Sequence, residues 1–163
     1  MTQKLKGFTL IELIVVIGII AILAAIVIVA VNPARQFAQA RNTQRRSDVT
    51  AILNAVHQYA ADNNGTLPAG IGASYAAHNI CSNAAAAGTC TNSSTLVDLG
   101  GPAGGTAILV PTYLTSIPKD PGGASAAGTD ADTKYTISTD ADKRVTIGAP
   151  QAELTGVVIN VVR

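Results

Sequence analysis

Aromatic and charged residues are both scarce in this sequence. Of its 163 residues only 4% are aromatic, none is tryptophan, and 13% are charged, which is about half the usual share. This low charge excludes a highly charged disordered chain. The formal net charge of +1 gives no general attraction for nucleic acid. The length suits one domain with an appendage.

The sequence does contain one long apolar block. Residues 8–31 include 21 hydrophobic residues out of 24, whereas the rest of the chain is 41% hydrophobic and rich in Ala, Gly, Ser and Thr. As a helix the block is about 36 Å long, and a bilayer core is about 30 Å thick. No small-residue cleavage site lies in a polar stretch just after it. The block therefore predicts an uncleaved single-pass membrane helix.

Two features distinguish this block from a plain membrane anchor. Glu12 places a carboxylate inside it, and such residues in membrane helices usually have a partner. The alternative is that Glu12 lies near the helix start, where negative charge is favourable. The leader, residues 1–7, is short and basic and ends in Gly7 immediately before Phe8.

Residues 6–13, which read KGFTLIEL, resemble the class III signal of type IV pilins and type II secretion pseudopilins. The resemblance implies cleavage between Gly7 and Phe8 by a prepilin peptidase, followed by N-methylation of Phe8. It also implies that the amine of Phe8 on one subunit meets Glu12 of a neighbour. Two buried charges that pair are tolerated, so this contact sets the register of the assembly. A purely intramolecular use of Glu12 is the alternative.

The resemblance further implies a helical homopolymer built through residues 8–31. The precursor waits in the cytoplasmic membrane, and an assembly platform with its ATPase moves it into an extracellular filament. Charge counting leaves the orientation open, since basic residues flank both ends of the span. A secretion pseudopilus and a membrane-anchored adhesive or binding module that never polymerises are the competing interpretations.

Residues 32–64 predict an amphipathic second half of the helix. Val49, Ile52, Val56 and Tyr59 recur at helical spacing, and this stripe is expected to pack under a sheet. The helix is expected to stop at residues 62–65, with Gly65 in the left-handed cap.

Two residues are candidates for distortion of the long helix. Pro33 interrupts helical hydrogen bonding, and Gly18 lies inside the apolar half.

Four arginines form a basic cluster before the first acid of the helix's second half, Asp48; they are Arg35, Arg41, Arg45 and Arg46. Contact with nucleic acid or anionic lipid is one interpretation. A solvated face or a subunit contact is the commoner one. In the latter case the aspartates of residues 120–142 offer partners on a neighbouring subunit.

Residues 65–105 predict a long loop region with little apolar pattern. The resemblance places Cys81 and Cys90 outside the cytoplasm, where a disulfide forms readily. A Cys81–Cys90 bridge closes a short loop and stabilises the chain by ~3 kcal/mol in the chain-entropy account.

Residues 106–163 predict a small antiparallel sheet. Strand-like segments cover residues 106–110, 134–138, 144–148 and 155–162, and residues 139–143 predict a hairpin turn. The fold class is therefore α+β, with a long N-terminal helix packed against this sheet. Residues 113–121 resemble the Tyr-Leu-x-x-x-Pro-x-Asp-Pro stretch of major pseudopilins, with Tyr113, Leu114 and Ile117 anchoring a turn on the core.

The same resemblance raises a calcium site further along the chain. Four aspartates supply oxygen ligands of the required kind, namely Asp130, Asp132, Asp140 and Asp142. The alternative is that these residues serve turns, and no metal is the favoured interpretation. No catalytic motif is present, His57 falls off the apolar stripe and is expected to be exposed, and His78 lies in the Ala-rich loop. The sequence predicts a structural protein rather than an enzyme.

Overall fold

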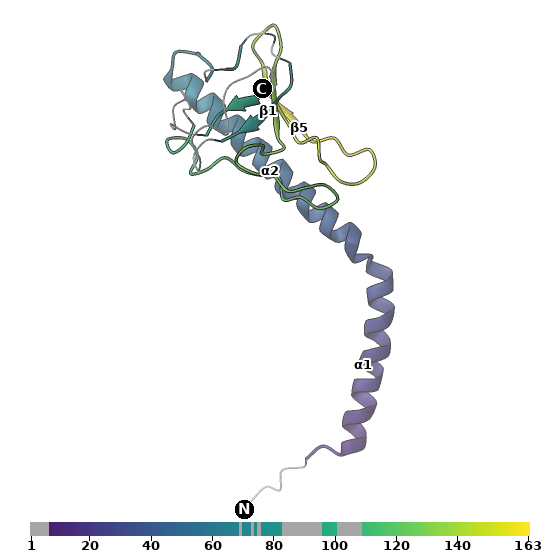
Figure 1. The fold of residues 1–163 in the computed structure, drawn as a ribbon. Helices are drawn as coiled ribbons and strands as arrows, with labels where there is room; N and C mark the ends of the chain where they lie inside the picture. The colour runs from purple at the N-terminus through teal and green to yellow at the C-terminus, as the bar shows by residue number, and fades with distance from the viewer. Residues whose placement is uncertain (1–6, 69, 73, 75, 83–95, 101–108) are drawn as a thin grey trace, which may run out of the picture. The chain divides into compact units, whose positions relative to one another are not determined.

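The computed structural model describes residues 7–68, 70–72, 74, 76–82, 96–100 and 109–163. The chain forms two compact units, Met1–Phe37 and Ala38–Arg163. We refer to the second unit as the coat domain. Figure 1 shows the helices and strands of both.

The first unit is dominated by helix α1, Leu10–Val31. Thr9 caps its N-terminus, and no residue of α1 is buried. The helix ends at Asn32, whose φ of 44° lies in the left-handed region. Asn tolerates this conformation better than other residues with a Cβ.

Helix α2, Pro33–Asp62, begins immediately after this break. Pro33 thus takes the first helical position, where its missing N–H is not needed. Of the two candidates for distortion, Pro33 lies at an interruption of the helix, and Gly18 lies inside the unbroken α1. At the other end of α2, Gly65 N donates to the Ala60 carbonyl at 2.7 Å. Asn64 and Gly65 have φ of 53° and 79°, so the left-handed stop predicted at Gly65 begins one residue earlier.

The described residues of the coat domain form a five-stranded sheet with strand order β2-β1-β3-β4-β5. The strands are β1 His78–Cys81, β2 Leu96–Asp98, β3 Thr136–Thr139, β4 Val145–Gly148 and β5 Asn160–Val162. The β1–β2 pair is parallel, and the other neighbours are antiparallel. The α+β fold class is confirmed.

Two strands lie where the sequence predicted a loop. Both β1 and β2 fall within residues 65–105, and they are too short to show a clear alternating pattern. The strand predicted at 106–110 is not observed over its described part, since Leu109 and Val110 lie in a bend and a turn. Residues 106–108 of that prediction lie outside the described residues.

The core of the coat domain joins α2 to the sheet. Val49, Ile52 and Val56 are fully buried, and Tyr59 packs at the margin of the same cluster. Their partners include Ile137 of β3 and Ile147 of β4. The predicted stripe is confirmed as the buried face of α2.

Candidate functional site

The N-terminus of α1 is held by a reciprocal pair of side chains. Glu12 N donates to Thr9 Oγ1 at 3.3 Å, while Thr9 N and Thr9 Oγ1 each donate to Glu12 Oε2 at 2.8 Å. This capping box satisfies backbone N–H groups that a helix start leaves without partners. Within a single chain, Glu12 is therefore engaged with Thr9.

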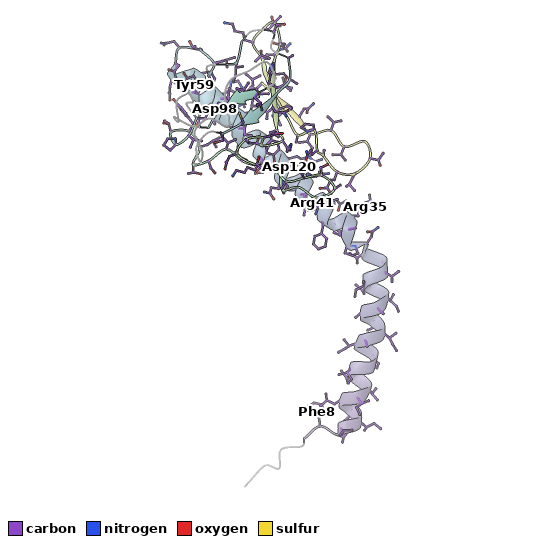
Figure 2. All side chains as sticks on the ribbon, viewed as in Figure 1. Phe8, Arg35, Arg41, Tyr59, Asp98 and Asp120 are labelled. Atoms are coloured by element: carbon purple, nitrogen blue, oxygen red, sulfur yellow. The ribbon has the colours of Figure 1, made fainter. Side chains whose placement is uncertain are left out.

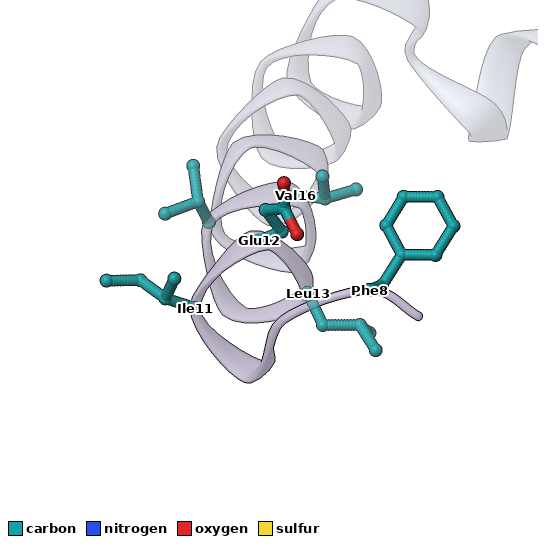
Figure 3. Close-up of a pocket in the computed structure, with 6 residues that line it drawn as sticks. Phe8, Ile11, Glu12, Leu13 and Val16 are labelled. Carbon is teal, nitrogen blue, oxygen red and sulfur yellow. The ribbon is translucent and has the colours of Figure 1, made fainter. Parts of the chain in front are cut away.

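The rest of α1 presents an uninterrupted apolar surface. Phe8 is 89% exposed, and the exposed residues continue to Val31. Figure 3 shows the Glu12 carboxylate between the side chains of Ile11 and Phe8, with Leu13 and Val16 alongside. The helix is long and apolar enough to cross a membrane. A surface of this kind needs lipid or a protein partner to cover it.

The predicted processing point lies just before this helix. Gly7 is exposed, and apart from its chain neighbours no heavy atom of the described residues lies within 4 Å of the position that a Cβ would take. The described part of the chain therefore leaves the Gly7–Phe8 bond sterically open.

The coat domain contains a second polar centre, built around Arg45 of α2. Its side chain is 1% exposed and binds Asp120 in a two-point ion pair, Nε to Oδ2 at 2.7 Å and Nη2 to Oδ1 at 2.9 Å. The remaining donors reach the Gly122 carbonyl, Asn42 Oδ1 and Glu153 Oε1 at 2.7, 3.0 and 3.1 Å. These bonds use all five guanidinium N–H groups, which a buried arginine requires.

Arg41 extends this ionic network toward the surface. Its Nε and Nη2 donate to the two oxygens of Glu153 at 2.6 and 2.5 Å. The Arg41 guanidinium, with Arg45 adding to it, lowers the pKa of Glu153 to about 2. Hydrogen bonding to Asp120 raises the pKa of Arg45. Figure 2 shows Arg41 close to Asp120. The network fixes two loops of the coat domain onto α2.

The glycine pair 122–123 is explained by this network. Gly122 has φ of 76°, and its carbonyl accepts from Arg45. A Cβ on Gly123 would lie 2.4 Å from both Arg41 Nε and Glu153 Oε1. Any larger residue at position 123 would displace the ion pair.

The prediction for the basic cluster was therefore wrong for two of its members. Arg41 and Arg45 find Glu153 and Asp120 within the same chain, instead of facing solvent or a neighbouring subunit. Arg35 and Arg46 are exposed. The signal that was missed is the spacing, because Asn42 and Arg45 continue the stripe of Val49, Ile52 and Val56 at helical intervals.

A second buried polar contact lies on the same helix. Tyr135 is fully buried and donates to Asp48 Oδ2 at 2.6 Å. Burial raises the pKa of both groups, and the Tyr135 hydrogen bond partly offsets the effect on Asp48. This contact fastens the start of β3 to α2.

The four aspartates considered for calcium do not come together. Asp130 and Asp132 precede β3, and Asp140 and Asp142 follow it, so a strand about 13 Å long separates the two pairs. Each carboxylate lies beside a lysine or arginine of the same chain. Among the described residues no group of three or more metal-binding side chains occurs.

Two of these aspartates, Asp132 and Asp140, form turns. Asp140 Oδ1 accepts from the backbone N–H groups of Asp142 and Arg144 at 3.0 and 2.8 Å. Asp132 Oδ1 accepts from Lys134 N at 3.0 Å. Such local bonds are the usual work of aspartate in turns.

The cysteine and histidine predictions have different outcomes. Cys81 is buried at the end of β1, while Cys90 lies outside the described residues, so the bridge stays a prediction.

His78 belongs to β1 and is buried, which the loop assignment missed. The expectation that His57 is exposed was wrong, since it is half-buried. Its Nε2 has no hydrogen-bond partner in the described part of the chain, and burial lowers its pKa.

Comparison with known proteins gives one match, confined to the N-terminus. The family model described as the prokaryotic N-terminal methylation motif matches residues 3–28. No curated protein and no solved structure matches the chain. The matched range covers most of the basic leader, the Gly7–Phe8 bond, the capping box and most of α1. The chain thus carries the class III signal, which supports its membership of the type IV pilin-like and pseudopilin family.

Proposed function

We propose that this protein is a structural subunit of a type IV pilus-like helical filament. After cleavage between Gly7 and Phe8 and methylation of the new terminus, α1 leaves the membrane and packs into the centre of a bundle. The observation that carries the proposal is that every residue of α1 is exposed in the single chain, and the methylation motif covers most of that helix. Burying that apolar surface against other copies supplies the driving force for assembly.

Glu12 has a second role in this proposal. In the single chain its carboxylate accepts from Thr9 at 2.8 Å. In a filament it would be surrounded by apolar helices, where an unpaired charge is costly. A charged Phe8 amine from a neighbouring subunit supplies the counter-charge and fixes the axial position of that neighbour. The Cys81–Cys90 bridge, formed outside the cytoplasm, fastens the coat domain.

A matched pair of variants tests this role. Thr9→Val removes the capping hydroxyl and leaves the carboxylate, whereas Glu12→Ala removes the carboxylate. We expect Glu12→Ala to abolish filaments sheared from the cell surface while membrane insertion persists, and Thr9→Val to keep most of the yield. Equal losses in both variants would show that Glu12 acts only as a cap. A normal yield from Glu12→Ala would refute the register role.

The chemical processing is tested separately. Mass spectrometry of the protein from its native membrane is expected to show Phe8 at the N-terminus with one added methyl group. An unprocessed Met1 terminus without methylation would overturn the filament proposal and favour a membrane-anchored module that does not polymerise.

A major pseudopilin of a type II secretion system is the second candidate. The observation that favours it is the Tyr-Leu-x-x-x-Pro-x-Asp-Pro stretch at 113–121, in which Ile117 and Asp120 are both buried. Electron microscopy of the native cell surface separates the two candidates. Long surface filaments that contain this chain support a pilus, and their absence together with impaired secretion in a deletion strain supports a pseudopilus.

A further inference from the structure

We propose that residues 32–37 bind the headgroup layer of an anionic bilayer, on the side where α1 leaves the membrane. We call these residues the interfacial segment. The proposal rests on the membrane-stored precursor of the proposed function and adds a lipid-binding site to it. This site would hold the helix at a fixed depth before assembly.

The depth of the segment follows from the length of α1. Its 22 residues make a helix of about 33 Å, which matches a hydrocarbon core of about 30 Å. With α1 spanning the core, Asn32 lies at the boundary. At the helical rise, the six residues of the interfacial segment extend about 9 Å, close to the thickness of one headgroup layer.

Phe37 supplies the apolar contact. It is one of only two phenylalanines in the chain, and 63% of its surface is exposed. Side chains on a helix tilt toward its N-terminus, so the ring at position 37 reaches back toward the boundary. An exposed aromatic side chain at this depth gains free energy by entering the interface.

Arg35 supplies the charge. It is exposed and makes no ion pair with any residue that the structure describes, whereas Arg41 pairs with Glu153. The sequence has no acidic residue between Glu12 and Asp48, so nothing near the segment in the chain neutralises it. An exposed arginine without an ion pair, in the same helical turn as Phe37, is suited to anionic phosphate, and its aliphatic stem can lie along the apolar boundary.

The absence of tryptophan makes this proposal directly measurable. Phe37→Trp creates a single fluorophore in the segment. Val162→Trp, at a coat-domain position with a similar exposure of 57%, is the matched control. The full chain is reconstituted at a high lipid-to-protein ratio into vesicles of phosphatidylcholine, with or without phosphatidylglycerol, so that copies rarely meet.

We expect the Phe37→Trp protein in anionic vesicles to fluoresce at shorter wavelength and to resist acrylamide quenching. Lipids brominated near the headgroup end of the acyl chain should quench it, and the Val162→Trp protein should show neither effect. Adding Arg35→Gln should lower the ratio of shielded to water-exposed fluorophore in anionic vesicles by about fivefold, the effect expected for one basic side chain. It should have little effect in neutral vesicles.

Each other outcome overturns a stated part. If the two tryptophan proteins are equally accessible to acrylamide, the interfacial segment does not bind the membrane. If shielding is the same in both lipid mixtures and insensitive to Arg35→Gln, recognition of anionic headgroups is refuted. If the chain fails to float with vesicles of either composition, membrane storage of α1 is refuted, and the proposed function loses its precursor as well.

Discussion

Helix α1 and the coat domain use apolar side chains in opposite ways. In the coat domain, Ile52 and Ile147 are fully buried in the same hydrophobic core. Ile20 of α1, in contrast, is 58% exposed. The two regions also differ in where their charged side chains lie. The coat domain buries the Arg45–Asp120 pair in its interior, and α1 carries a single charged residue at its first turn. One region has completed its packing within the chain, whereas the apolar surface of the other is left exposed in the single chain.

The largest effect is expected from breaking the buried ion pair of the coat domain. Asp120→Ala leaves the Arg45 guanidinium buried without its two-point partner, which is expected to lower the free energy of unfolding by about 3–5 kcal/mol. The measurement is urea unfolding of the full chain in detergent, followed by the near-ultraviolet circular dichroism of its tyrosines. The double variant Arg45→Met with Asp120→Ala should recover part of the loss. A loss below about 1 kcal/mol for the single variant would contradict a fully buried charge.

The next effect compares the same substitution in the two regions. Ile52→Ala opens a cavity between α2 and the sheet, and it is expected to cost about 2–5 kcal/mol of coat-domain stability. Ile20→Ala, in α1, is expected to change that stability by less than about 0.5 kcal/mol in the same unfolding assay. If both variants lost the same free energy of unfolding, α1 would contribute to the coat-domain core. That result would contradict the difference between the two regions.

The smallest expected effect is the loss of coat-domain stability at low pH. Because Arg41 and Arg45 lower the pKa of Glu153 from 4.5 to about 2, the unfolded chain takes up a proton there before the folded chain does. The stability supplied by Glu153 is complete above about pH 4.5 and is lost as the pH falls toward about 2. We expect Glu153→Gln to be less stable than the parent protein at neutral pH, with the difference shrinking over that window. A difference that is constant with pH would contradict the ion-pair origin of the shift.

Local patterns in the sequence were enough to predict much of this fold. The stripe of Val49, Ile52 and Val56 follows the helical repeat, so the buried face of α2 was accessible without a structure. The β3–β4 hairpin was predicted because two alternating segments flank an Asp-rich turn. At the N-terminal site, residues 6–13 form a contiguous motif, KGFTLIEL, so it can be read directly from the sequence. The family match covers it.

Long-range contacts were not accessible in this way. Strands β1 and β2 have four and three residues, and they are held by pairing with each other and by β3 beside β1, rather than by their own pattern. Arg45 and Asp120 are separated by 75 positions, so the burial of one cannot be deduced from the residues around the other. A polar residue on an apolar stripe signals a buried partner but does not identify it.

The capping box has a consequence for the processed form of the chain. Cleavage after Gly7 would place a positively charged amine on Phe8, one residue before the cap Thr9. The N-terminal end of a helix already carries a partial positive charge from its aligned peptide dipoles, so this new cation is electrostatically unfavourable there. Glu12, in the first turn, supplies the compensating negative charge within the same chain. The carboxylate would then keep the newly cut helix end intact during the interval between processing and the arrival of a neighbouring subunit.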